Sequence, residues 1–351
     1  MQKIAVLYQA QLPPIKNGAQ KPMKPNGYAD SGADIVYELK KNGIDVITPS
    51  ENPAIENDKD WVFPDTKKGI QNALDKGANI FWLNTVLFKN HSIENVFKLN
   101  IEFVGQLPNQ VDIYDDKFHT NNFLKENQIP IPETQLISFQ NLADYTLGID
   151  FPLVIKPLRG RGSQGISLVK TKEELDNSLK ILFSNNTYGK SIYLEQYLSG
   201  QEITITVMPA GIYTIQNQSQ EMLKPWCLPA VKRFNHHHGI VPYNGIVAVM
   251  ENSSILENDE LNSDAVLQTY RACEKAAELL KIKAPIRIDC RADENGKYFL
   301  FDVNMKPNMT GPSRPQRKNQ DSLTLLAARK IGWEYIDLLK NMLNQRWTGI
   351  P

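Results

Sequence analysis

Three side chains in the last quarter of the chain carry the clearest chemistry. Asp302 and Asn304 stand two residues apart in one apolar run, and Asp289 stands in the apolar run before it. The turn residues at 293–296 join the two runs as a β-hairpin, and residues two apart in a strand point to the same face. Two carboxylates and a carboxamide are therefore expected to face one another. Oxygen ligands of this kind suit Mg²⁺ or Mn²⁺ that also holds substrate phosphates.

Arg287 adds a cation to the same predicted face, because it alternates with Asp289. A guanidinium there could neutralise charge that develops on a transferred phosphoryl group or on an acyl oxyanion. The other interpretation is a buried ion pair between Arg287 and one of the two aspartates. Both interpretations fit this segment.

The stretch 151–169, FPLVIKPLRGRGSQGISLV, predicts a strand, a glycine-rich loop and a second strand. Glycine lets backbone N–H groups approach an anion closely, and Lys156, Arg159 and Arg161 supply charge for a polyphosphate. The loop is neither a Walker loop nor a dinucleotide fingerprint, because it leads into a strand. A hairpin with a solvated basic tip is the alternative.

The elements that position these residues begin with a βαβ unit. Strands are expected over 3–8 and 44–48, with an amphipathic helix over 31–42 between them. The long loop 9–30 follows the first strand at the end where open α/β sheets bind ligands. It either faces a substrate or has no functional role.

The rest of the chain alternates strands and helices. Further helices are expected over 66–76, 114–126, 172–183, 265–280 and 323–343, and further strands over 80–84, 103–105, 191–195, 202–208, 284–292 and 298–304. A length of 351 residues suits two or three domains. The expected domains are an N-terminal α/β domain facing the substrate, a small central domain and a C-terminal domain with the metal site, over 1–105, 106–196 and 197–351.

Composition excludes several function classes. Lys plus Arg equals Asp plus Glu at 39 each, so no global basic field favours nucleic acid or an anionic membrane. Three cysteines without CxxC spacing argue against a disulfide scaffold or structural zinc and fit the reducing cytoplasm. No stretch approaches the roughly 20 apolar residues of a membrane span.

Three segments together resemble the ATP-grasp enzymes, and most closely the D-alanine:D-alanine ligase branch. They are FPLVIKPLRGRGSQGISLV, SIYLEQYLSGQEITITV and RIDCRADENGKYFLFDVNMKPNMTG, and they occur in the order and spacing of that family. The similarity covers about residues 100–343. It implies an α/β ATP-grasp fold with a Rossmann-like N-terminal domain, and it is compatible with a homodimer, since dimers are frequent in that branch.

The resemblance also implies roles for individual residues. The implied ATP-binding residues are Lys117, Lys156, Ser163, Gln164, Gly165, Glu195, Gln196, Leu198, Glu202 and Lys232. Asp289, Asp302 and Asn304 match the ligands of Mg²⁺ or Mn²⁺, with two ions expected. Arg287 and Lys232 match catalytic residues, Arg287 stabilising an oxyanion and Lys232 contacting phosphate from a mobile loop. In this scheme a carboxylate attacks the γ-phosphoryl group, and an amine captures the acyl phosphate.

The positions implied to face the substrates match the family pattern only in part. They are Asn26, Asn308, Arg314, Arg317, Ser322 and Leu323. Ser322 and Leu323 match the pair that receives the acceptor carboxylate, whereas the others depart from the pattern. Asn26 stands where many D-alanine:D-alanine ligases have a glutamate for the first substrate's ammonium, and Asn308 replaces a glycine. Arg314 and Arg317 lie in extra residues before Ser322. They either bind an acidic or larger acceptor or belong to a solvated loop.

Three functions follow from this pattern. The first is an ATP-dependent carboxylate–amine ligase that forms a dipeptide or a related amide through an acyl phosphate, with substrates other than two D-alanines. The alternative is D-alanine:D-alanine ligase itself, which serves cell-wall synthesis. The third is a regulatory protein that binds ATP without catalysis. His236–His238, in a predicted loop, either belong to a lid, contact a substrate weakly or are solvated.

Overall fold

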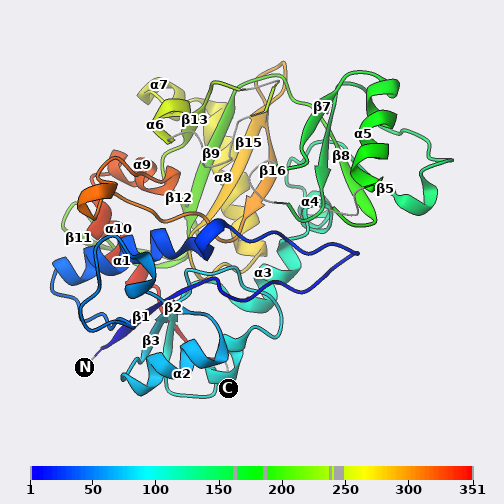
Figure 1. The fold of residues 1–351 in the computed structure, drawn as a ribbon. Helices are drawn as coiled ribbons and strands as arrows, with labels where there is room; N and C mark the ends of the chain where they lie inside the picture. The colour runs from blue at the N-terminus through cyan, green and yellow to red at the C-terminus, as the bar shows by residue number, and fades with distance from the viewer. Residues whose placement is uncertain (1, 161–163, 185–187, 237–238, 241–248, 350–351) are drawn as a thin grey trace.

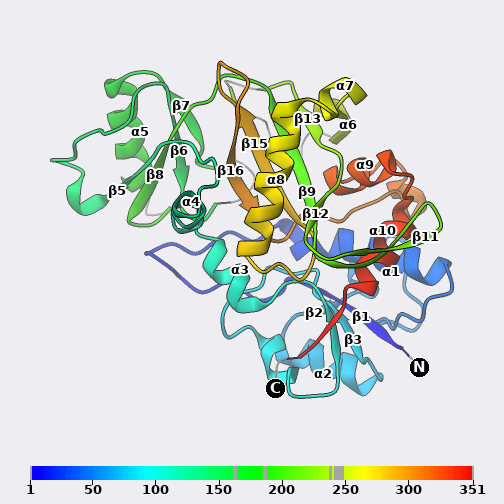
Figure 2. The same cartoon turned by 180° about the vertical axis from the view of Figure 1, so that it is seen from behind.

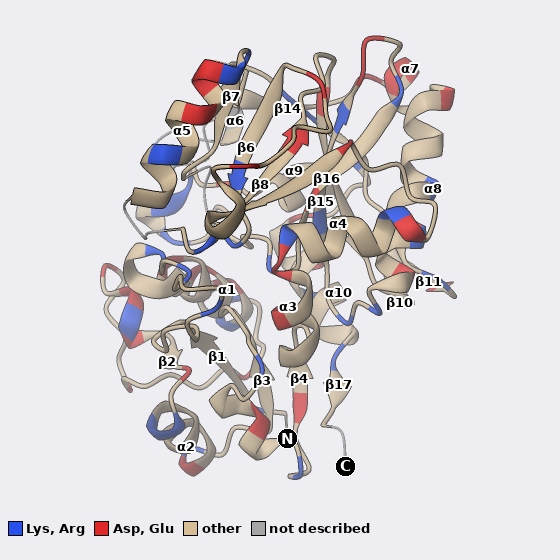
Figure 3. Ribbon diagram, turned by 90° about the vertical axis from the view of Figure 1, so that its right-hand side faces the viewer, with Lys and Arg blue, Asp and Glu red and all other residues tan. Residues whose placement is uncertain are grey.

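The strands of this computed structural model form three principal sheets and one separate hairpin (Figures 1 and 2). The structure describes residues 2–160, 164–184, 188–236, 239–240 and 249–349. The mixture of parallel and antiparallel sheets with covering helices confirms the predicted α/β class. Lys and Arg (blue) and Asp and Glu (red) are both scattered over the ribbon, in line with the balanced composition (Figure 3). No helix of the described residues is long and apolar enough to cross a bilayer.

The first sheet is built mainly from the N-terminal part of the chain. Its order is β17-β4-β3-β1-β2, with β1 to β4 parallel and β17 antiparallel. Their bounds are Ile4–Tyr8 (β1), Phe63–Pro64 (β2), Ile80–Trp82 (β3), Glu102–Val104 (β4) and Trp347–Thr348 (β17). Helices α1 (Ala29–Lys41) and α2 (Lys67–Asp75) accompany this sheet. The C-terminal segment therefore returns to complete an N-terminal sheet.

The prediction of a strand over 44–48 is wrong. This segment makes only a single parallel bridge, between Val46 and Ile4. The same edge of β1 is occupied further along by β2, where Leu7 pairs with Phe63. The edge is therefore divided between two segments, and neither has room for a long ladder.

The small sheet has the order β5-β8-β6-β7 and is antiparallel throughout. Its strands are Thr134–Ser138 (β5), Leu153–Pro157 (β6), Ser167–Val169 (β7) and Ser191–Gln196 (β8). Leu153 lies opposite Val169, so the predicted strand, loop and strand are confirmed. Helix α5 (Lys172–Ser184) packs on this sheet through Leu175, Leu179 and Phe183, which are buried in one apolar cluster.

The large sheet carries the hairpin predicted from the sequence. Its strands are Glu202–Met208 (β9), Trp226–Cys227 (β12), Val231–Arg233 (β13), Ser253–Ile255 (β14), Ile286–Ala292 (β15) and Tyr298–Asn304 (β16). Helix α8 (Asp264–Leu279) covers one face through an apolar stripe that includes Cys273 and Ala276 (Figure 2). The separate hairpin, β10 (Gly211–Ile215) and β11 (Gln218–Met222), was missing from the sequence prediction.

The helix expected over 114–126 is observed as α4 (Lys117–Glu126), which starts where the carboxylate of Asp116 accepts the backbone N–H of His119. A separate helix before it, α3 (Pro108–Tyr114), was missing from the sequence prediction. The helix expected over 323–343 is broken into α9 (Leu323–Lys330) and α10 (Tyr335–Asn344), with Gly332 between them at φ +87°. The remaining helices are short: α6 Val249–Asn252, α7 Asn258–Leu261, and 3₁₀ turns at Pro25–Tyr28, Asp58–Asp60, Ser92–Val96, Phe139–Asn141 and Pro315–Arg317.

The long loop after β1 reaches across the molecule to the small sheet (Figure 1). The carbonyl of Asn17 accepts the backbone N–H of Lys190, 2.9 Å away. Lys16 pairs with Asp112 on α3, and Lys21 pairs with Asp115 directly after α3. The loop is therefore held between the first sheet and the small sheet, where it can cover a ligand.

Candidate active site

One cavity of about 720 Å³ collects most of the residues that the sequence singled out. Its walls come from the loop after β1, from the small sheet, from the large sheet and from the segment before α9. Lys156, Glu195, Asp289 and Asn304 all line it. Residues separated by more than a hundred positions therefore share one enclosed space.

Lys156 and Glu195 form a buried ion pair in the small sheet. Nζ of Lys156 lies 2.5 Å from Oε1 of Glu195, and both side chains are about 5% exposed or less. The hydroxyl of Tyr193 donates to the other oxygen of Glu195 at 3.2 Å. Burial raises the pKa of Glu195, although the charge of Lys156 opposes that shift. Glu195 is therefore placed to hold the lysine within the cavity.

Lys117, the first residue of α4, is held in a similar way by Asp302 on β16. Burial alone would lower the pKa of Lys117, but the charge of Asp302 raises it above its ordinary value. A polyphosphate that enters the cavity can replace these carboxylates as the partner of both lysines, Lys117 and Lys156. The pairs keep the two cations positioned without a ligand.

Glu202 lies at the start of β9 and is buried. Nε2 of His236 lies 2.9 Å from one of its oxygens, and Nη1 of Arg291 lies 3.7 Å from the same oxygen. His236 thus contacts the site wall, whereas His237 and His238 lie outside the described residues. A carboxylate held at this place can accept hydrogen bonds from ribose hydroxyls.

The loop residues expected near the nucleotide are only partly described. Gln164, Gln196 and Leu198 line the cavity. Gly165 has φ +71°, and a Cβ there would come within 2.7 Å of the Tyr188 ring, so glycine is required. Ser163 lies outside the described residues.

The residues predicted to form the metal face, Asp289, Asp302 and Asn304, lie on the β15–β16 hairpin. Asp289 lies directly opposite Asp302, and Arg287 lies opposite Asn304. Arg287 makes a bidentate contact with Asp289: Nε donates to Oδ1 and Nη2 donates to Oδ2, each at 3.1 Å. Thr204 also donates to Asp289, at 2.8 Å. The ion-pair interpretation of Arg287 is therefore seen in the structure, together with the predicted clustering.

Whether this face fits Mg²⁺ can be judged from its donors. No group of three or more His, Cys, Asp or Glu in the described part of the chain could hold a metal. Asp289 and Asp302 offer two carboxylates, and Asn304 offers a carboxamide oxygen that accepts the backbone N–H of Lys306. Such a set fits Mg²⁺, which usually takes one or two carboxylates and completes its shell with water and substrate phosphates.

Lys232 is not where the sequence places it. Its ammonium pairs with Glu260 at 3.5 Å, and it does not line the cavity. Strand β13 alternates, and Arg233 is the residue opposite Glu202. Arg233 is therefore on the cavity side and Lys232 on the other side, which corrects the expected phosphate contact.

The residues expected to face the substrates divide into two groups. Asn308, Ser322 and Leu323 line the cavity. Ser322 also caps α9, where its hydroxyl accepts the N–H of Leu325. Asn26 is exposed and does not line the cavity, because the backbone turns through left-handed conformations there and presents Tyr28 instead.

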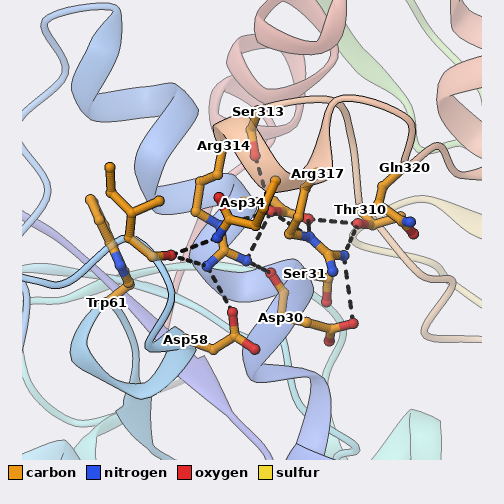
Figure 4. A network of polar contacts seen from close by, with 12 residues as sticks. Asp30, Ser31, Asp34, Asp58, Trp61, Thr310, Ser313, Arg314, Arg317 and Gln320 are labelled. Atoms are coloured by element: carbon orange, nitrogen blue, oxygen red, sulfur yellow. Dashed lines mark hydrogen bonds and ion pairs between the residues drawn. The ribbon is translucent and has the colours of Figure 1, made fainter.

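Arg314 and Arg317 belong to a buried ionic network (Figure 4). Arg314 is 0% exposed, and its guanidinium contacts Asp34 at 3.1 Å and Asp58 at 2.7 Å. Nε of Arg317 lies 2.8 Å from Asp34. Neither arginine lines the cavity. The predicted acceptor contact is therefore corrected: these cations fasten the segment before α9 to helix α1.

Several cavity residues were missed by the sequence prediction. They are Lys24, Tyr28, Arg233, Arg291, Lys306 and Asp321. Strand alternation points to Arg291, since it is two residues beyond Asp289. For Lys24 and Tyr28, the available signal was a loop over 9–28 that has three lysines and no acidic residue.

Comparisons with known proteins show which family this chain resembles. The profile of the family described as D-ala D-ala ligase C-terminus matches residues 132–344. A D-alanine–D-alanine ligase of Francisella philomiragia is 24% identical over 248 residues, which are 70% of this chain and 72% of the relative. A D-alanine–D-alanine ligase of Synechococcus sp. is 25% identical over 248 residues, 70% of this chain and 68% of the relative.

Two solved structures share the fold. D-alanine–D-alanine ligase from Bacillus anthracis complexed with ATP superposes with a TM-score of 0.65 at 19% identity, covering 98% of this chain and 97% of that one. VanG D-Ala:D-Ser ligase from Enterococcus faecalis gives a TM-score of 0.68 at 16% identity, covering 98% and 99%. The likeness extends over the whole chain, including the N-terminal sheet.

Proposed function

The chain belongs to the D-Ala–D-Ala ligase family and is an ATP-dependent ligase that forms carbon–nitrogen bonds. We propose that it joins a small carboxylate to a small amine through an acyl phosphate. The carboxylate attacks the γ-phosphoryl group of ATP and releases ADP. The amine then attacks the acyl carbon and releases phosphate, and one proton leaves the nitrogen. The products are an amide, ADP and phosphate.

One observation carries this proposal: a single cavity joins the lysine pairs to the metal face. Lys117 and Lys156, which are suited to phosphates, lie in the same space as Asp289 and Asp302. Since Lys117 is bound to Asp302 itself, the phosphate cations and the metal carboxylates adjoin directly. Transfer of a phosphoryl group needs this proximity of positive charge and positioned oxygen ligands.

Different residues of the cavity bind the phosphates, bind the ribose and stabilise charge in this reaction. Lys117 and Lys156 leave their carboxylate partners to hold phosphate oxygens, and Glu202 receives the ribose hydroxyls. Mg²⁺, held by the metal face, neutralises phosphate charge when bound. Arg287 stabilises negative charge on the acyl oxygen while its contact with Asp289 fixes the guanidinium plane.

Two D-alanines are the first candidate substrates. The family relatives named above are D-alanine–D-alanine ligases, which supports this alternative better than the main expectation of other substrates. Ser322 and Leu323 in the cavity wall are consistent with an acceptor carboxylate near the start of α9.

A second candidate, a pair that includes an acidic substrate, is favoured by the loop after β1. Residues 9–28 contain no aspartate or glutamate, and Lys21 and Lys24 of this loop line the cavity. An ammonium at this place has no carboxylate from the loop to bind. We further propose that the enzyme works in the cytoplasm, as its three free cysteines suggest. A homodimer remains a prediction.

ADP release measured against a panel of D- and L-amino acids, alone and in pairs, tests the function. Turnover with D-alanine alone supports the first candidate, and turnover only with other pairs supports the second. The control is Asp302→Asn, which keeps the size of the side chain but removes a metal carboxylate. ATP binding without ADP release from any pair would contradict the ligase function and favour a regulatory protein.

A further inference from the structure

Two lysines meet one aromatic ring next to the metal face. Nζ of Lys306 lies 3.1 Å and Nζ of Lys24 lies 5.3 Å from the centroid of the Tyr28 ring, and all three residues line the cavity. We propose that these three residues form an anion subsite for a second, non-reacting carboxylate of the donor substrate. The donor is then a dicarboxylic acid or an acidic amino acid. This inference rests on the proposed ligase function and develops its second candidate.

The Tyr28 ring is positioned by a left-handed backbone turn over residues 26–28. Asn26, Gly27 and Tyr28 have φ of 59°, 57° and 66°, and left-handed conformations are costly for residues other than glycine. The run is held by hydrogen bonds from the N–H of Gln9 to the Gly27 carbonyl and from the Asn84 carboxamide to the Tyr28 carbonyl, at 2.8 and 2.9 Å. Strain maintained in this way is typical of ligand sites. Here it turns an aromatic ring into the cavity.

The charge of Lys24 is only partly neutralised by its neighbours, so it can still attract an anionic ligand. It pairs with Asp30 at 2.7 Å, but Asp30 also lies 3.6 Å from Arg317. Burial alone would raise the pKa of Asp30, whereas the charges of Lys24 and Arg317 lower it below the ordinary value. One ionised carboxylate is thus shared by two cations. A ligand carboxylate can therefore be a further partner for Lys24.

Lys306 places the second cation close to the reacting groups. It follows Asn304 of the metal face by two residues, and its backbone N–H donates to the Asn304 side chain at 3.0 Å. Its ammonium is buried, and a buried cation over an aromatic ring is strongly attracted to an anion because little water screens it. A dicarboxylate can then reach from the metal face to this end of the cavity.

Among the described residues that line the cavity, every carboxylate already has a cationic partner, so a donor ammonium at this end finds none without one. The carboxylates that line the cavity are Asp115, Glu195, Glu202, Asp289, Asp302 and Asp321. Each has the cationic side chain of a lysine or an arginine within 4.0 Å. An ammonium near Lys24 and Lys306 would instead meet like charge, which is unfavourable in a partly desolvated site. The chemistry of this end therefore selects an anion.

Calorimetric titration with Mg²⁺ and a non-hydrolysable ATP analogue tests the subsite without requiring turnover. The probes are glutarate, its matched monocarboxylate valerate, and D-alanine, with succinate and adipate to find the preferred length. Since a charge-assisted hydrogen bond is lost with the second carboxylate, glutarate or a neighbour in the series should bind at least about 10-fold more tightly than valerate or D-alanine.

Lysine-to-methionine variants assign the effect to these residues. Lys24→Met and Lys306→Met keep the length of the chain but remove the charge, and each should weaken dicarboxylate binding about 10-fold, with the affinity for the ATP analogue unchanged. Lys297→Met is the matched control, because Nζ of Lys297 also lies over a ring, 5.0 Å from Phe299, but outside the cavity. The control should bind like the wild type.

The outcomes separate this inference from the ligase function. Tight dicarboxylate binding that the two variants lose supports the subsite, even if no amine pair gives ADP release and the ligase function fails. Binding of D-alanine that equals or exceeds that of every dicarboxylate overturns the inference, as do variants that bind like the wild type. ADP release with D-alanine alone, unchanged in Lys306→Met, would leave the ligase function standing without the anion subsite.

Discussion

Replacing Asp34 by asparagine should strongly destabilise the protein, because Asp34 is the centre of the buried network between α1 and the segment before α9 (Figure 4). Its carboxylate is 0% exposed and receives Arg314 at 3.1 Å and Arg317 at 2.8 Å. The hydroxyls of Thr310 and Ser313 donate to it at 2.6 and 3.0 Å. All four donors come from residues 310–317, nearly 300 positions away in the chain.

The expected magnitude follows from the burial. Removing one partner of a buried pair costs about 3–5 kcal/mol, because the remaining charge stays buried without compensation. With a urea m-value of about 3 kcal/mol per molar, Asp34→Asn should lower the unfolding midpoint by about 1 M or more. The matched control is Asp176→Asn in the exposed Lys172–Asp176 pair, which should cost less than about 1 kcal/mol.

Substitution of several members at once distinguishes the network from a simple packing effect. The triple change Asp34→Leu, Arg314→Met and Arg317→Met removes every buried charge of the central cluster, so it should cost less than Asp34→Asn alone. Urea unfolding followed by circular dichroism measures all variants. A cost for Asp34→Asn no larger than that of the exposed control would refute the reasoning. An acceptor KM raised in stably folded Arg314→Met would restore the substrate contact predicted from the sequence.

Other predictions concern the metal face and the nucleotide. Asp302→Ala or Asn304→Ala should abolish ADP release but weaken adenosine binding only modestly; wild-type turnover in either variant would contradict the metal assignment. Arg233→Met should weaken ATP binding about 10-fold if its cavity position serves phosphate, whereas Lys232→Met should leave it unchanged; equal effects would contradict the strand alternation. Burial raises the pKa of Asp302, but the charges of Lys117, Lys156 and Arg287 together outweigh burial and lower that pKa below its ordinary value. Its stabilising effect is therefore present above about pH 4 and lost as the pH falls through the lower folded value, so Asp302→Asn should flatten the acid limb of a urea-stability profile. An unchanged limb would show that this pair contributes nothing.

The local arrangement of the site could be predicted from the sequence because strand geometry is local. Asp302 and Asn304 share a face by their spacing, and the turn before them fixes the hairpin that brings Asp289 opposite. The two apolar runs around the glycine-rich loop likewise specify the pairing of β6 and β7. Each of these two strand pairs depends on a few neighbouring residues. The larger fold then brings the two pairs to one cavity.

Contacts between distant segments were decided by the tertiary structure alone. Arg314 and Arg317 have the charge and the position expected of an acceptor site, and nothing near them in the chain shows that Asp34 will bury both. Lys232 and Arg233 are adjacent cations, and only the register of β13 against β9 puts Arg233 on the cavity side.

The same division applies to the substrate end of the cavity. The sequence determined that residues 9–28, after the first strand, include three lysines and no acidic residue. Only the folded chain decided that a left-handed turn at Tyr28 would gather Lys24 and Lys306 on one ring. The physical reason is that residue type fixes which charges are available, whereas burial and distance decide which of them pair with each other and which face a ligand.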